Sequence, residues 1–120
     1  MLSKILNTDL NEQMVVWRHH LHRHPELSFE ERLTSDYIAS VLISKDIKIH
    51  RGLAGTGIVA TIRGEKSGPV IGLRADMDAL PITELNTFDY KSVHEGKMHA
   101  CGHDGHSAML LGAAVFLKEN

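Results

Sequence analysis

The segment DIKIHRGLAGTGIVATIRGEKSGPVIGLRAD, residues 46–76, carries the β-strand pattern on which the fold depends. Its beginning, DIKIHRG, alternates apolar and polar residues. GIVATIRG and PVIGLRAD, further along, are short β-branched runs bounded by glycine or proline. These patterns are typical of strands. We therefore predict three strands, near residues 46–51, 57–63 and 69–75.

Helical patterns lie on both sides of this segment. Apolar residues recur at helical spacing from Leu10 to Leu21, which predicts a helix over roughly residues 8–22 that ends before Pro25. Ser28 and Glu31 have the spacing of a capping box and predict the start of a second helix. A third helix is predicted after Asp104, a plausible N-cap, through Leu117. Residues 77–97 are predicted to be mostly loop.

Helices, then strands, then a helix indicate the α/β class, with helices packed on a mostly parallel or mixed sheet. Three short strands are few for such a sheet, and the chain stops within a helical pattern. We therefore expect a piece of a larger protein.

Composition favours small-molecule chemistry or protein contacts. The net charge is −2 and no long basic run occurs, which argues against a nucleic-acid surface. The longest apolar run, AMLLGAAVFL, is about half of what a bilayer span needs. The opening MLSKILNTDL lacks the apolar core of a secretory signal, and the single cysteine cannot form an internal disulfide. We expect a cytoplasmic protein with no nucleic-acid or membrane partner.

The motif HACGHDGH, residues 99–106, is the first candidate site. Cys101 and His103 share a side on an extended segment, so they can bind one centre only if the helix starts after them. Gly102 and Gly105 allow such a bend. Thiolate and imidazole are common ligands of zinc and similar ions. Two alternatives remain: a buried cysteine beside surface histidines, and a cysteine nucleophile whose base is not evident.

The motif GLRADMDALP, residues 72–81, is the second candidate. Arg74, Asp76 and Asp78 alternate directly after a β-branched run, where open α/β sheets place their ligands. The acids could orient a metal-bound imidazole, bridge two cations or pair with Arg74, and the residues alone favour the salt bridge. The N-terminal histidines, residues 19, 20, 22 and 24, are interpreted as solvated or structural.

Four stretches occur in a specific order: HLHRHPELSFEE, TGIVATIRG, GLRADMDALPITE and MHACGHDGHSAMLLGAA. Together they resemble the amidohydrolase branch of the aminoacylase and carboxypeptidase metallopeptidases. That branch includes hippurate hydrolases, N-acyl-amino-acid deacetylases and hydrolases of indole-acetyl-amino-acid conjugates. The resemblance covers nearly the whole chain.

The resemblance implies that Cys101 and His103 are ligands of a site for two divalent ions, which could be Mn, Zn, Co or Ni. It makes Asp76 the active-site aspartate, with Asp78 as its rival. The family's remaining ligands and its general-base glutamate lie downstream of the cysteine–histidine motif. After His106 this sequence offers only Glu119 as an acid, and no histidine.

By this resemblance, residues 1–120 are the N-terminal portion of a metallopeptidase-type catalytic domain, without its remainder or any dimerisation domain. The implied activity of the complete protein is metal-dependent hydrolysis of the amide bond of small N-acyl amino acids. The resemblance is also compatible with a homo-oligomer of that complete protein. The alternative is a truncated, non-catalytic remnant or a metal-binding or interaction module.

Overall fold

The computed structural model describes residues 7–120. Residues 1–6 belong to the opening stretch that we do not interpret as a secretory signal, and they lie outside the described part. The elements in chain order are α2 (Thr8–Arg23), α3 (Arg32–Ser44), β1 (Lys48–Leu53), β2 (Gly57–Thr61) and α4 (His103–Glu119). All three predicted helices are confirmed, and so is the mixed α/β class. In the described part, no helix is both long and apolar enough to cross a membrane.

The first helix begins and ends where local chemistry requires it. The side chain of Asn7 accepts a hydrogen bond from the Leu10 amide at 3.3 Å, which satisfies one of the unpaired donors at a helix start. The helix ends at Arg23, before Pro25, whose ring disfavours helical backbone in the residue ahead of it. Trp17 and Leu21 on its inner face are buried.

The predicted capping box at the second helix is wrong. Glu31 occupies the N-cap position of α3, but its side chain makes no capping hydrogen bond. The Ser28 hydroxyl instead donates to the Asp78 carboxylate at 2.8 Å, and Glu31 accepts a hydrogen bond from Thr56 at 2.9 Å. Both side chains form hydrogen bonds with residues distant in sequence, and local spacing does not reveal these partners.

Glu26 supplies the cap that the sequence pattern assigned to Ser28. Its carboxylate accepts from the backbone amides of Leu33 at 3.2 Å and Thr34 at 2.6 Å, and also from the Thr34 hydroxyl. Phe29 lies between cap and helix with a φ of 66°, a left-handed conformation that turns the chain there. This turn frees Ser28 to face the segment that carries Asp78.

The sheet of the described residues is one antiparallel pair, β1 and β2, with Arg51 opposite Ile58. The prediction of a third strand near residues 69–75 is wrong, because that run has no strand conformation. A strand needs a hydrogen-bonded neighbour and a covered face. Val70 is 99% exposed and Ile71 80% exposed, so the face is not covered, and residues 69–75 make no backbone hydrogen bond with another described segment. The expectation of a mostly parallel or mixed sheet does not describe this pair.

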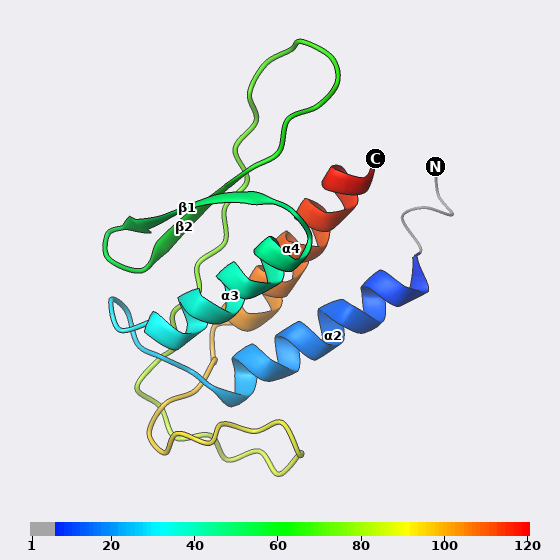
Figure 1. The fold of residues 1–120 in the computed structure, drawn as a ribbon. Coiled ribbons are helices and arrows are strands. Elements are labelled where there is room, and N and C mark those ends of the chain that lie inside the picture. Colours follow the sequence, from blue (N-terminus) through cyan, green and yellow to red (C-terminus); the bar gives the residue numbers. More distant parts are fainter. Residues whose placement is uncertain (1–6) are drawn as a thin grey trace.

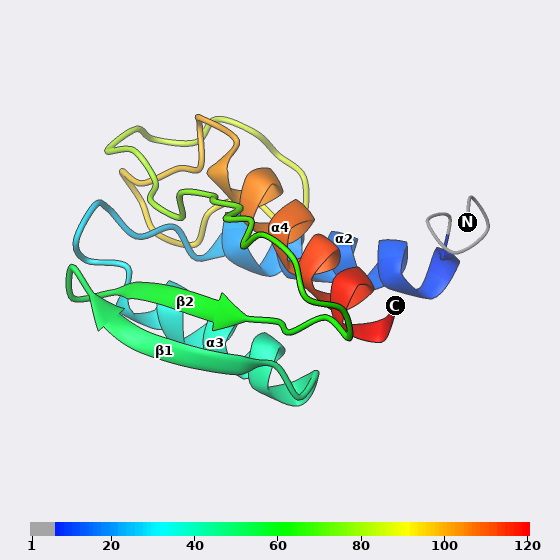
Figure 2. The ribbon, with the colours of Figure 1, turned by 90° about the horizontal axis from the view of Figure 1, so that it is seen from above.

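The elements form layers around one core (Figures 1 and 2). The β1–β2 hairpin covers one side of α3, and α4 and α2 lie on the other side. Helices α2 and α4 approach closely at Gly112, where an added Cβ would clash with the Met14 sulfur. The core contains the buried residues Leu10, Trp17, Val41, Leu42, Ile47, Ala108, Leu111 and Val115.

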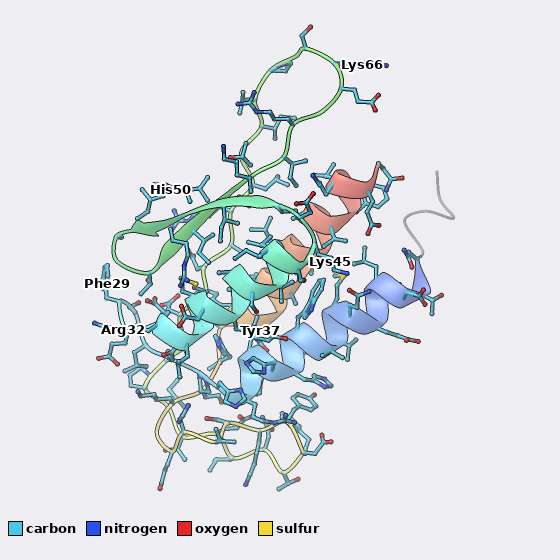
Figure 3. The ribbon with its side chains drawn as sticks, viewed as in Figure 1. Phe29, Arg32, Tyr37, Lys45, His50 and Lys66 are labelled. Carbon is cyan, nitrogen blue, oxygen red and sulfur yellow. The ribbon has the colours of Figure 1, made fainter. Side chains whose placement is uncertain are left out.

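The connection from β2 to α4 is mostly irregular, as predicted for residues 77–97. Its first part projects away from the body, with Lys66 near the tip (Figure 3). Its later part is anchored by backbone hydrogen bonds: Ala79 donates to Glu26, and Leu80 and Met98 exchange two bonds. These contacts hold both candidate motifs beside the adjoining ends of α2 and α4.

Candidate metal centre

His103 is the first residue of α4, and its ring is held in a defined state. Its Nδ1 lies 2.9 Å from Asp78 Oδ1 and 3.1 Å from the Asp78 main-chain oxygen. Both of these atoms are acceptors, so Nδ1 carries the proton and Nε2 keeps its lone pair in the neutral ring. Metal-ligating histidines commonly have such a carboxylate or carbonyl partner on the second nitrogen.

Cys101 lies just outside the same helix and is exposed. Gly102 is the N-cap residue, with a φ of 81° in the left-handed region that glycine adopts without strain. The helix therefore begins at His103, so the expectation that it starts after both Cys101 and His103 is met for Cys101 alone. The expectation that Asp104 is the N-cap is wrong, because Asp104 lies buried in the first helical turn. Within residues 7–120, no three His, Cys, Asp or Glu side chains converge to hold an ion.

The two aspartates of the second motif have different surroundings. Asp76 Oδ1 accepts from Arg74 at 2.8 Å, and both side chains are at least half exposed, so the favoured salt bridge is confirmed. It is the main-chain oxygen of Asp76 that contacts α4, accepting from Ser107 at 3.0 Å. Asp78, in contrast, faces His103 with its carboxylate.

The surroundings of Asp78 favour its charged form. The hydrogen bond from Ser28 is the main cause that holds the pKa of Asp78 below its ordinary value. Partial burial opposes this shift of the pKa, and the hydrogen bond with His103 reinforces it. Asp78 is thus a carboxylate with one partner on the chain turn before α3 and another on α4.

Replacing Ser28 by alanine is expected to raise the pKa of Asp78 towards its ordinary value. A lowered carboxyl pKa stabilises the fold above the unfolded-state pKa, and this stabilisation is lost as pH falls through the folded-state pKa. Ser28→Ala should therefore remove part of the stability at neutral pH. Carboxyl ¹³C titration measures the pKa, and urea unfolding measures the stability.

Ser40→Ala is the matched control, because the Ser40 hydroxyl contacts only its own helix, at the Tyr37 main-chain oxygen. An Asp78 titration that is the same in Ser28→Ala and in the parent would contradict the assigned cause.

Two histidines near this centre were missed as site neighbours by sequence reasoning. His22, grouped with the solvated or structural histidines, is 4% exposed and contacts Asp104 and Glu84. His99 is 5% exposed, and neither ring nitrogen has a partner among the described residues. Burial is the main cause that lowers the pKa of His99. The partners of His22 lie 82 and 62 residues away, so no local spacing could reveal them.

The other N-terminal histidines fit the structural interpretation. His20 stacks on Tyr37 of α3, with ring centroids 3.7 Å apart, and His19 stacks on Tyr90 at 3.8 Å. Tyr37 lies on the side of α3 that faces α2 (Figure 3). Burial is the main cause that lowers the pKa of His20, with the nearby charges of His24 and Arg23 adding to it. These rings pack helices and loop together.

Known proteins share this arrangement of sequence and fold. Residues 72–120 match peptidase family M20/M25/M40. The chain is 53% identical to an N-acetyl-L-cysteine deacetylase of Bacillus subtilis, over 92% of this chain and 27% of that protein. It is 47% identical to an N-acyl-L-amino acid amidohydrolase of Geobacillus stearothermophilus, over 97% and 31%. It is 43% identical to a hippurate hydrolase of Campylobacter jejuni, over 91% and 28%.

A solved structure agrees with these relatives. The YXEP protein of Bacillus subtilis, described as a dinuclear metal binding peptidase from the M20 family, superposes with a TM-score of 0.90 at 42% identity. The match covers 94% of this chain and 32% of that one. The chain thus spans about a third of the length of these relatives. On the matched motifs, the sequence identity and the fold, the chain is similar to members of peptidase family M20/M25/M40.

Proposed function

We propose that the protein containing this chain is a metal-dependent amidohydrolase that cleaves the amide bond of N-acyl amino acids. Its products are a carboxylic acid and a free amino acid. One observation carries the proposal: Asp78 fixes the imidazole ring of His103 through a hydrogen bond, and His103 lies two residues after the exposed Cys101. Relatives named for deacetylation of N-acetyl-L-cysteine and for hydrolysis of N-acyl amino acids and hippurate support it.

The donor set of this chain fits a divalent metal. Cys101 offers a thiolate, and the lone pair on His103 Nε2 is available because Asp78 engages Nδ1. A pair of Mn, Zn, Co or Ni ions, when bound, would polarise the scissile carbonyl and lower the pKa of a bound water. A relative described as dinuclear supports two ions. The family's other ligands and its general base are assigned, by the resemblance, to parts outside these residues.

The residues of this chain act as ligands and as their supports. Asp78 orients the His103 imidazole, and Ser28 in turn holds the Asp78 carboxylate. Gly102 turns the backbone between the two ligands. Between the rival aspartates, these contacts favour Asp78 for the active-site role, whereas the resemblance alone assigned Asp76. We propose Cys101 and His103 as ligands and Asp78 as the residue that positions the imidazole.

The proposed substrate is a small molecule. The net charge of −2 without a basic run supports neither a nucleic-acid nor a membrane partner, and the single cysteine fits a cytoplasmic location. A homo-oligomer of the complete protein stays open. The acyl group and the amino acid would be chosen by pocket walls outside this chain.

Metal removal tests the proposal. In a protein of the relatives' length that contains this chain, hippurate and other N-acyl amino acids should release free amino acid. Exhaustive chelation should end this release, because both the water and the carbonyl depend on the metal. Adding back Mn, Zn, Co or Ni singly then identifies the ion that restores it. Undiminished hydrolysis after the metal is shown to be gone would exclude a metallohydrolase.

The 120 residues alone are expected to show no amidase turnover and to hold divalent metal weakly. Two proposed protein ligands are fewer than the three that catalytic zinc sites usually have, and the resemblance assigns the general base to a part outside these residues. Bound metal after dialysis and hippurate hydrolysis are measured against a Cys101→Ala, His103→Ala control. Turnover well above this control with stoichiometric metal would contradict the expectation. A non-catalytic module would be supported if the longer protein also showed no turnover.

A further inference from the structure

A buried ion-pair cluster lies directly behind the candidate metal centre. Near the end of α2, His22 Nδ1 lies 2.8 Å from Asp104 Oδ2, and Nε2 lies 2.8 Å from Glu84 Oε2. The side chains of all three residues are at most 5% exposed. Asp104 belongs to the first turn of α4, and Glu84 belongs to the irregular segment after Asp78. One ring therefore connects three separate parts of the chain.

Both ring nitrogens of His22 face carboxylate oxygens. Carboxylate oxygens only accept hydrogen bonds, so a ring with a carboxylate oxygen at each nitrogen donates from both. A ring that donates to two ionised carboxylates is an imidazolium. Arg18 supplies a second positive charge, with its Nε 3.3 Å from Asp104 Oδ2. Two cations thus face two carboxylates, and pairing of this kind is what makes buried charges tolerable.

Glu84 is also tied to its own segment. Burial works against its charged form, but hydrogen bonds from His22, Asn86 and the Ser92 amide outweigh burial and hold the pKa of Glu84 below its ordinary value. The Ser92 amide lies 2.6 Å from Glu84 Oε1, and the Asn86 amide 2.8 Å from Oε2. A contact at Glu84 therefore acts on the part of the segment that contains Asn86 and Ser92.

The cluster is coupled to the candidate ligand through the backbone. Asp104 follows His103 directly, so the bond from His22 fixes the helical turn that carries the imidazole. Glu84 lies six positions after Asp78 on the segment that carries the partner of this imidazole. We propose that His22 is a positioning residue of the metal centre, a buried imidazolium that joins Asp104 to Glu84 and thereby holds His103 against Asp78. The proposed function enters only in naming His103 a ligand.

Ring ¹⁵N spectroscopy of the 120-residue chain tests the charge assignment without metal or substrate. In the parent chain, His22 should show two protonated ring nitrogens. His103 should show a protonated Nδ1 and an unprotonated Nε2. A His22 ring with only one protonated nitrogen would overturn the proposal, and this measurement does not depend on whether any variant folds.

His22→Gln tests the positioning role. Glutamine supplies no charge and has one donor nitrogen, so it cannot reproduce the bridge. In this variant, His103 should lose its single ring state and show both tautomers. Hydrogen exchange at the Ser92 amide should accelerate at least about tenfold, because a buried carboxylate has lost its charged partner. An unchanged His103 ring in a folded His22→Gln chain would overturn the proposal.

His19→Gln is the matched control, because His19 lies on the same helix and stacks on Tyr90 of the same segment. Its His103 signals should match those of the parent. Where His22→Gln does not fold, His22→Gln combined with Glu84→Gln removes the uncompensated carboxylate and should refold, with His103 still in both tautomers. A single Nδ1–H tautomer in that double variant would contradict the role. Loss of hydrolysis in a protein with intact ring spectra would instead count against the proposed function alone.

Discussion

Replacing Cys101 by serine in the longer, metal-loaded protein is expected to lower bound metal and hydrolysis together. Cys101 is the single cysteine of the chain and is exposed beside the start of α4. A serine hydroxyl keeps its proton near neutral pH and is a much poorer ligand than a thiolate. Removing a residue that merely supports a ligand costs ten- to a hundredfold in metal affinity or activity, so loss of the ligand itself should exceed about a hundredfold.

Elemental analysis of bound metal and kcat/KM, measured on the same samples, check this expectation. Met109→Leu is the matched control, because Met109 is a sulfur-containing residue on the exposed side of the same helix. If Cys101→Ser kept its full metal complement but no longer formed a covalent adduct that the parent forms, Cys101 would be a nucleophile. Parallel losses of metal and activity, without any adduct in the parent, support a ligand.

Asp78→Asn is expected to reduce metal affinity and kcat/KM by roughly ten- to a hundredfold. The amide carries no charge and can turn its NH₂ group towards His103 Nδ1, which would favour the wrong tautomer. Isothermal titration with the metal that restores activity measures the affinity. Ring ¹⁵N signals of His103 report the tautomer in the same variant.

Asp76→Asn is the natural comparison, because Asp76 carries the same carboxylate two residues earlier. Its described side-chain contact is the exposed pair with Arg74, and exposed pairs contribute little to stability. We expect near-parental metal affinity and activity. A large loss in Asp76→Asn with a small one in Asp78→Asn would restore the assignment that the resemblance gives.

Sequence patterns predicted the parts of the fold that local chemistry controls. Helix α2 follows from apolar spacing and from Pro25, and the bend before α4 follows from Gly102 beside the two proposed ligands. The prediction of the third strand failed because a β-branched run favours a strand but does not supply its hydrogen-bonded neighbour. The prediction of the capping box failed because the Glu26 carboxylate accepts the hydrogen bond from the Thr34 amide at the start of α3.

The candidate site was predictable only in part, for a related reason. Alternation placed Asp76 and Asp78 on one side of an extended segment, and by this criterion the two are equivalent. The contact with His103, which forms only when the segment meets α4, separates them. His22 was interpreted from its own helix, whereas its role depends on Asp104 and Glu84. Neither partner is identifiable before the chain is folded.

The long separation between His22 and Asp104 also has a consequence for the time course of folding. The contact closes a loop of 82 residues, whereas α2, α3 and the β1–β2 hairpin form from contacts between near neighbours in sequence. Closing a long loop costs chain entropy before its contacts stabilise the fold, and folds rich in such contacts form slowly. The local elements should therefore appear early. The pairing of His22 with Asp104 should be among the last contacts to form and among the first to be lost when the chain begins to unfold.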